Sequence, residues 1–167
     1  GSDDESDLFI LLRAFRFAEK NQFDPGRCAR FGINAGAARE AGQLWEQFLS
    51  IARAEGLDIA EGENQPNAIA RCVLAGFPDQ VAVRLDQGTL RCALVHHRRG
   101  VLARESTVHR ARLLTASEIR EIESSEGERQ VLLTLATAIK QEWLRELFPA
   151  AVVEKTEVTF DPLLRRV

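Results

Sequence analysis

The residues best suited to chemistry gather in segment 96–104, which reads HHRRGVLAR. Two of the three histidines in the chain stand side by side here, followed by two arginines. Between Arg91 and Arg112 the chain has six arginines against one acidic residue, Glu105, although its formal net charge is −3. Guanidinium groups offer several planar donors to phosphate, and flat rings stack on bases. The candidate functions of this segment are therefore metal binding, catalysis and nucleic-acid binding.

The pattern disfavours metal binding and catalysis. Adjacent side chains on a strand point to opposite faces, so His96 and His97 make a poor ligand pair, and no cluster of cysteines or carboxylates accompanies His109. Ser106 and Thr107 have no glycine-flanked nucleophile elbow around them. The chain has no GxxxxGK[ST] loop and no DEAH-like acidic motif. We therefore expect no catalytic residue, no ATP hydrolysis, and no metal or cofactor in this chain.

Composition is that of an ordinary globular protein, with 45% hydrophobic and 28% charged residues. No apolar run approaches the roughly 20 residues that span a bilayer, and no secretory signal is present, which predicts a cytoplasmic protein with no membrane partner. Cys28, Cys72 and Cys92 are odd in number and widely spaced, and we expect all three to be buried thiols rather than disulfides or zinc ligands. The start GSDDE (1–5) is expected to be a tag scar and acidic leader, and the lack of methionine predicts a fragment of a longer protein.

Residues 6–77 are predicted to form four helices joined by short connections, which is typical of a small bundle. The first covers 7–20, and the others run from Pro25 to Gly32, from Asn34 to Gly56 and from Pro66 to Gly76. The capping residues expected at their starts are Ser6 or Asp7, Asp24, Asn34 and Asn64. The apolar stripe of the longest helix comprises Ala41, Leu44, Trp45, Phe48, Leu49 and Ala52.

From Pro78 onward the pattern changes to β-type runs. Residues 80–95 are predicted to form a hairpin, and HHRRG is predicted to form a second turn. The runs VLARESTV and RARLLTAS are predicted to continue the β-strands. Two strands are expected around 124–127, followed by the short helix KQEWLRELF and a final strand AVVEKTEVTF. Strands with one helix before the last of them fit a small Greek-key barrel such as an OB-fold. The predicted class is α+β: a helical bundle (6–77) and an OB-fold-like β domain (78–167), which we expect to be truncated at its C-terminus.

This order of features resembles the C-terminal accessory region of DEAH-type ATP-dependent helicases, a ratchet-like helical bundle followed by an OB-fold. The opening of that region, SDxLxLLxAY/F, is similar to SDLFILLRAF in this chain. The helix that leads into the first barrel strand of the family is similar to NAIARCVLAGFPDQVAVR. The family strand xLTxxxYIRxVT is similar to LLTASEIREIE. FDPGRCARFGINAGAAREAGQLWEQFLSIARAEGL is similar to the family's WCxxxFLNxRxL segment. The tail WLRELFPAAVVEKTEVTFDP looks closer to the bacterial HrpB-like branch. The resemblance spans residues 6–167.

The resemblance implies a non-catalytic fragment that helps to hold single-stranded RNA or DNA against motor domains of the same parent chain. ATP and Mg would belong to that parent, and an activator protein could dock on the OB-fold. The family's usual arginine two residues after Asn34 is Gly36 here, which predicts that phosphate contacts of the bundle are weaker or moved to HHRRG. The predicted nucleic-acid-binding residues are Arg91, His96, His97, Arg98, Arg99 and Arg104 of the β domain, and Asn34, Arg39 and Gln43 of the bundle.

Two alternatives stay open at this point. HHRRG can be a solvated hairpin tip, which charge clusters usually are. The chain can also be a protein-docking platform for helicase activators that does not contact nucleic acid. Salt dependence separates the readings, because nucleic-acid binding falls steeply with salt and a largely apolar protein interface does not.

Overall fold

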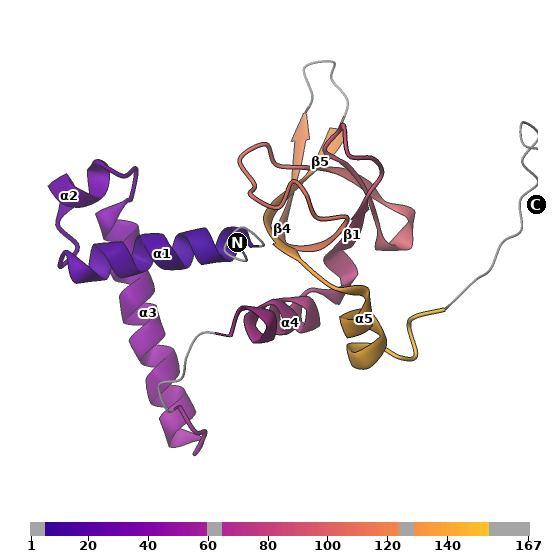
Figure 1. The fold of residues 1–167 in the computed structure, drawn as a ribbon. Helices are drawn as coiled ribbons and strands as arrows, with labels where there is room; N and C mark the ends of the chain where they lie inside the picture. Colours follow the sequence, from indigo (N-terminus) through magenta and orange to yellow (C-terminus); the bar gives the residue numbers. More distant parts are fainter. Residues whose placement is uncertain (1–5, 60–64, 124–128, 154–167) are drawn as a thin grey trace, which may run out of the picture.

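A computed structural model describes residues 6–59, 65–123 and 129–153 and has the predicted α+β class (Figure 1). Residues 1–5, Asn64, the break at 124–127 and most of the predicted last strand lie outside the described residues. The helices are α1 (Asp7–Lys20), α2 (Pro25–Ala29), α3 (Ala35–Ala54), α4 (Pro66–Gly76) and α5 (Gln141–Leu147). The strands are β1 (Val81–Arg84), β2 (Arg91–Leu94), β3 (Arg99–Leu102), β4 (Leu113–Glu123) and β5 (Arg129–Ala138).

The caps predicted for the first three helices are confirmed. In each case a side-chain oxygen accepts a hydrogen bond from an amide that the helix start leaves unpaired. Ser6 accepts from Leu8 (3.2 Å), Asp24 from Arg27 (2.7 Å) and Asn34 from Ala37 (3.0 Å). Gly56 follows α3 with a φ of 72°, a left-handed conformation that glycine adopts without steric cost.

The five strands form one mixed sheet that closes on itself, which we call the closed sheet. They pair in the order β1-β2-β3-β5-β4, and β4 returns to β1. The pair β3–β5 is parallel and the other four pairs are antiparallel. Alternate residues point inward, as a pleated strand requires. The interior is filled by Ala82, Cys92, Leu94, Leu102, Val108, Leu114, Ala116, Leu133 and Ala136.

The hairpin at 80–95, the two strands around 124–127 and the short helix after them are confirmed. Residues 103–112, which were expected to continue the β-type runs, instead form a connection without strand. Val108 from this connection is 2% exposed and belongs to the core of the closed sheet. Burial of Val108 therefore anchors this connection to the core of the closed sheet.

The four predicted helices form, but α4 packs against the closed sheet rather than with the other three. Its Ala70 and Leu74 share a buried cluster with Val81 of β1, Ile139 and Trp143 of α5. Figure 1 shows α4 and α5 together beneath the sheet, while α1, α2 and α3 form a separate group. A single short turn, Pro78–Gln80, joins α4 to β1 and keeps the helix next to the strand that follows it.

The group of α1, α2 and α3 has a small core of Ala18, Cys28 and Ala35. The rings of Phe15 and Phe23 lie over Gly42 on α3, so α1 covers only the first half of that helix. The apolar stripe predicted on α3 is therefore largely uncovered, and the second half of α3 extends past α1 (Figure 1). Its exposed members include Leu44, Trp45 and Phe48, which are 52%, 55% and 58% exposed.

The cysteine prediction is confirmed for Cys28 and Cys92, which are buried, and is wrong for Cys72, which is exposed. Cys72 lies on the side of α4 opposite to Ala70 and Leu74, which face the closed sheet. Burial raises the pKa of the Cys92 thiol. None of the helices described has the length and apolar character needed to cross a membrane.

Candidate nucleic-acid interface

Arg91 and Arg99 lie on adjacent strands of the closed sheet and both point outward. The register of β2 and β3 places Arg91 opposite Val101 and Ala93 opposite Arg99. The two arginines are therefore diagonal neighbours on one face, about 7–8 Å apart between Cα atoms. We call the outer surface formed by Arg91, Ala93, Arg99 and Val101 the β2–β3 face. Both arginines are exposed on it, and the two residues between them are small or apolar.

The β2–β3 face continues onto β1 as an apolar surface. Val83 pairs with Ala93 and is 37% exposed, and Leu85 after β1 is 51% exposed. An apolar surface beside two cations can contact sugars or bases while the cations bind phosphates.

The turn predicted at HHRRG is confirmed for its first part at the end of this face, whereas Arg99 and Gly100 already belong to β3. His96 and His97 both adopt the left-handed conformation, with φ of 59° and 58°. The amide of Leu94 donates to the carbonyl of Arg98 at 2.8 Å and closes the turn. The left-handed region costs a non-glycine residue about 1–2 kcal/mol, although histidine enters it more readily than most residues. Both imidazoles are exposed beside the β2–β3 face.

The adjacent arginines Arg98 and Arg99 have different surroundings. Arg98 Nη2 donates to the backbone carbonyl of Asp79, in the turn that leads into β1. Arg99 is the first residue of β3 and faces outward on the β2–β3 face. Arg104 is exposed two residues after β3 ends. The geometry thus separates Arg98, which anchors the turn, from Arg99, which is available to a ligand.

The three residues predicted on the helical side are not brought to the β2–β3 face. All three belong to the start of α3, and α1 spans the distance between α3 and the closed sheet (Figure 1). Asn34 is the cap of α3, and Arg39 Nη2 donates to the carbonyl of Phe23 at 3.4 Å. Gln43 is exposed.

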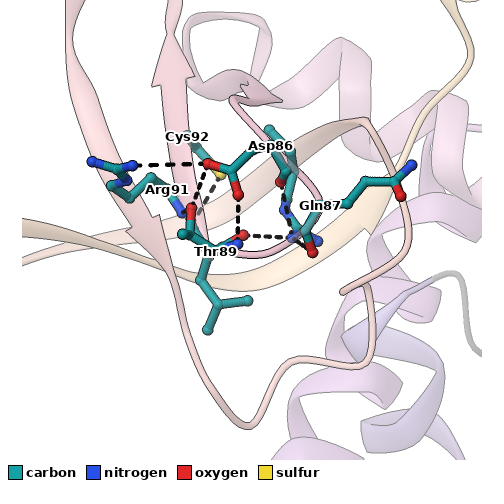
Figure 2. A network of polar contacts seen from close by, with 7 residues as sticks. Asp86, Gln87, Thr89, Arg91 and Cys92 are labelled. Carbon is teal, nitrogen blue, oxygen red and sulfur yellow. Dashed lines mark hydrogen bonds and ion pairs between the residues drawn. The ribbon is translucent and has the colours of Figure 1, made fainter.

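A polar network holds the loop between β1 and β2, which borders the β2–β3 face (Figure 2). Asp86 accepts hydrogen bonds from the amide (2.6 Å) and the hydroxyl (2.8 Å) of Thr89, and its carboxylate lies 3.9 Å from Arg91 Nη2. The hydroxyl bond from Thr89 is the main cause that lowers the pKa of Asp86 below its usual 3.8, with a smaller contribution from Arg91. The Asp86 carboxylate therefore lies beside the exposed guanidinium of Arg91.

Arg84 supports the same loop from inside and was missed in the sequence. It is 8% exposed, and its Nη2 donates to the carbonyls of Asp86, Gln87 and Thr89. The alternation in VAVRL was the available signal, because it places Arg84 on the same inward side as Ala82. A buried cation facing three carbonyls stabilises the loop conformation.

Acid is expected to weaken this loop. Because the pKa of Asp86 is lower in the folded chain than in the unfolded chain, its stabilisation is present above about pH 4 and is lost as the pH falls through the folded pKa. The pKa of Glu118 is also lowered, first by the hydroxyl of Thr134, and it adds in the same direction. Melting temperatures measured by circular dichroism from about pH 7 to pH 2 should fall less for Asp86→Asn than for the unaltered chain. Parallel curves for the two proteins would contradict the assignment.

Among the described residues, no group of three or more histidine, cysteine or acidic side chains is arranged to hold a metal. No protein-family model matches the chain, and a search of curated proteins finds no match either.

Proposed function

We propose that the chain is a non-catalytic accessory fragment of an ATP-dependent RNA helicase, which holds a single strand of nucleic acid against the motor domains of its parent. The observation that carries the proposal is the outward pair Arg91 and Arg99 on the β2–β3 face. The strand order, with its one parallel pair β3–β5, supports an OB-fold-like barrel. OB-folds bind oligonucleotides on strands 2 and 3 and on the loop between strands 1 and 2, which is where these residues lie.

In this proposal the β2–β3 face grips the backbone and does not read sequence. Each guanidinium binds a phosphate through paired N–H donors, while Val83, Leu85 and Ala93 contact the sugars and bases between them. The ion pair between Arg91 and Asp86 is exposed to solvent and is therefore weak, so a phosphate can take the place of that carboxylate. His96 and His97 stand at the end of the face, where their rings can stack on a base.

The proposal assigns ATP and magnesium to the motor domains of the parent and none to this chain. It requires no membrane and sets the complex in the cytoplasm. RNA and DNA strands both fit this backbone grip.

Fluorescence anisotropy with a labelled single-stranded RNA tests the proposal. The double variant Arg91→Gln with Arg99→Gln is expected to bind at least tenfold more weakly. Its plot of log K against log salt concentration should also be less steep by about 1.4, which is about 0.7 for each phosphate that is no longer neutralised. Arg98→Gln is expected to bind almost as well as the unaltered chain, because Arg98 is bonded to Asp79.

A control double variant, Arg30→Gln with Arg53→Gln, removes the same charge from exposed positions of the helical group. It should retain most of the affinity. Equal decreases in the two double variants would mean that net charge alone drives binding, and would contradict a grip at the β2–β3 face.

A protein-docking platform is the second candidate function, and the exposed half of α3 favours it. Leu44, Trp45, Phe48 and Ile51 are each more than half exposed and recur on one side of the helix. A contiguous apolar surface of this kind is typical of a protein interface. In this candidate a helicase activator or another partner protein docks on this surface of α3, and the chain does not contact nucleic acid. Absence of RNA binding at low salt would favour it.

A further inference from the structure

We propose that a cleft between the end of α1, the start of α2 and α3 binds a phosphate group. The cleft has a volume of about 460 Å³, and we call it the corner cleft. Three cations, Lys20, Arg27 and Arg39, line it together with one acid, Asp24. This local excess of positive charge stands out in a chain whose formal net charge is −3. The proposal is independent of the β2–β3 face, which is built on other residues.

The backbone that shapes the corner cleft is unusual. Gln22 and Phe23 are consecutive residues in the left-handed conformation, each with a φ of 55°. Neither is glycine, so the left-handed conformation is sterically unfavourable at both positions. The turn brings the start of α2 back beside the end of α1, so that Lys20 and Arg27 line the same cleft. Strain of this kind is found where a site requires a particular backbone path.

Arg39 is held at one wall of the cleft. Its guanidinium carbon lies 5.8 Å from the centroid of the Phe23 ring, and its Nη2 donates to the carbonyl of Phe23 at 3.4 Å. That bond uses one of the five N–H donors of the guanidinium. Stacking on the ring restricts the side chain, so less conformational entropy is lost when it binds an anion.

Arg27 also lines the cleft and is held by a chain of hydrogen bonds. Its Nη1 donates to Asn21 Oδ1 at 3.2 Å, and Asn21 Nδ2 donates to the carbonyl of Phe17 at 2.8 Å. Asp24 Oδ1 accepts from the amide of Arg27 as the cap of α2, and the carboxylate forms no ion pair with the Arg27 guanidinium. Within the described part of the chain, no carboxylate lies within salt-bridge distance of Lys20, Arg27 or Arg39.

Two oriented guanidiniums and an ammonium around one cleft fit the chemistry of phosphate. A phosphate offers several strong acceptor oxygens, and a guanidinium binds two of them side by side. The group can belong to a free phosphate, to the terminal monoester of a nucleic acid, or to a phosphodiester backbone. These sources share the same recognition, and the experiment distinguishes them.

The test is a titration of the ¹⁵N-labelled chain with inorganic phosphate at constant ionic strength, followed by NMR. We expect saturable shifts of the amides of residues 20–27, with a dissociation constant on the order of 1–10 mM. Arg27→Gln and Arg39→Gln should each weaken binding by about five- to tenfold. Arg30→Gln removes an exposed arginine that does not line the cleft, and should leave the affinity unchanged.

Asp24→Asn gives the sharpest discrimination. Asparagine caps a helix as well as aspartate does, so α2 is retained while the one negative charge of the cleft is removed. Phosphate should bind about two- to fivefold more tightly to this variant. Arg39→Lys keeps the charge and the apolar stem and should bind more tightly than Arg39→Gln. This comparison separates loss of charge from loss of packing on Phe23.

Competition identifies the source of the phosphate. Displacement of phosphate by a single strand that lacks a terminal phosphate supports the diester, displacement only by a 5′-phosphorylated strand supports the monoester, and displacement by neither supports the free anion. The proposal is overturned if no saturable shift appears, or if Asp24→Asn and Arg39→Gln both titrate like the unaltered chain. Failure of RNA to bind the β2–β3 face leaves the phosphate titration unaffected, so the two proposals fail separately.

Discussion

Replacing Asp7 with alanine is expected to lower the free energy of unfolding by about 3 kcal/mol. Both carboxylate oxygens accept hydrogen bonds from the closed sheet and its connections. Oδ1 accepts from Ser106 Oγ (3.1 Å) and from the amide (2.8 Å) and hydroxyl (3.0 Å) of Thr107, and Oδ2 accepts from the amide of Ala136 (2.8 Å). Each partly buried donor left unpaired costs about 1–3 kcal/mol, with some recovery through water. Urea denaturation followed by circular dichroism measures the change.

The large effect follows from the place of Asp7 at the junction of α1 and β5. Leu135 on β5 has a φ of 51°, a left-handed conformation inside a strand, and the amide of the next residue, Ala136, donates to Asp7. Ser6 forms an isolated bridge with Thr137, and their buried hydroxyls are 2.8 Å apart. The start of α1 is therefore bonded directly to the interrupted part of β5.

Two further variants define the origin of the destabilisation. Asp7→Asn retains one acceptor oxygen but presents an NH₂ group on its other side, so it can satisfy only one set of donors and should lower the free energy of unfolding by about 1–2 kcal/mol. Asp79→Ala removes an exposed aspartate next to β1 and should change stability by less than about 0.5 kcal/mol. If Asp7→Ala unfolds at the same urea concentration as Asp79→Ala, the junction does not contribute to stability.

Gly100→Ala is expected to lower the free energy of unfolding by about 2–3 kcal/mol. Gly100 is buried in β3, where it faces the parallel strand β5. A Cβ atom there would lie 3.0 Å from the carbonyl oxygen of Val131, 3.3 Å from Leu94 Cδ1 and 3.4 Å from Leu133 Cγ. The closest atom is backbone, so relief requires β5 to move and its pairing with β3 to weaken. Thermal and urea denaturation both report this change.

Gly88→Ala is the matched control for that substitution. Gly88 lies in the loop between β1 and β2, and a Cβ atom there would meet only Asp86 Oδ1, at an ordinary contact distance of 3.6 Å. Its stability should change by less than about 1 kcal/mol. Equal destabilisation at Gly100 and Gly88 would mean that the close approach of β3 and β5 does not limit the residue at position 100.

Residue types and their spacing predicted part of the candidate nucleic-acid interface. Clustering of arginines between Arg91 and Arg112 was visible in the chain, and the hairpin at 80–95, which carries Arg91, was predicted from alternation. Arg99 was expected in the turn and is instead the first residue of β3. Spacing could not separate Arg98 from its neighbour, because the partner of Arg98 is a backbone carbonyl of Asp79, 19 positions earlier. The corner cleft was also invisible, since it needs α1, α2 and α3 to meet.

Properties that depend on neighbours in the chain were correct from the residues alone: the α+β class and the caps Ser6, Asp24 and Asn34. The strands on either side of 124–127 were also correct, although their composition was mixed and the resemblance of LLTASEIREIE to a helicase strand supported that prediction. Caps and alternation act over a few residues, so they can be recognised without a fold. Contacts between distant segments decided the rest: the packing of α4 on the closed sheet, the uncovered stripe of α3, and the bonds of Asp7 to residues about a hundred or more positions away. The physical reason is that a helix with an apolar side can bury it against any apolar surface within reach, and its own residues do not specify which one.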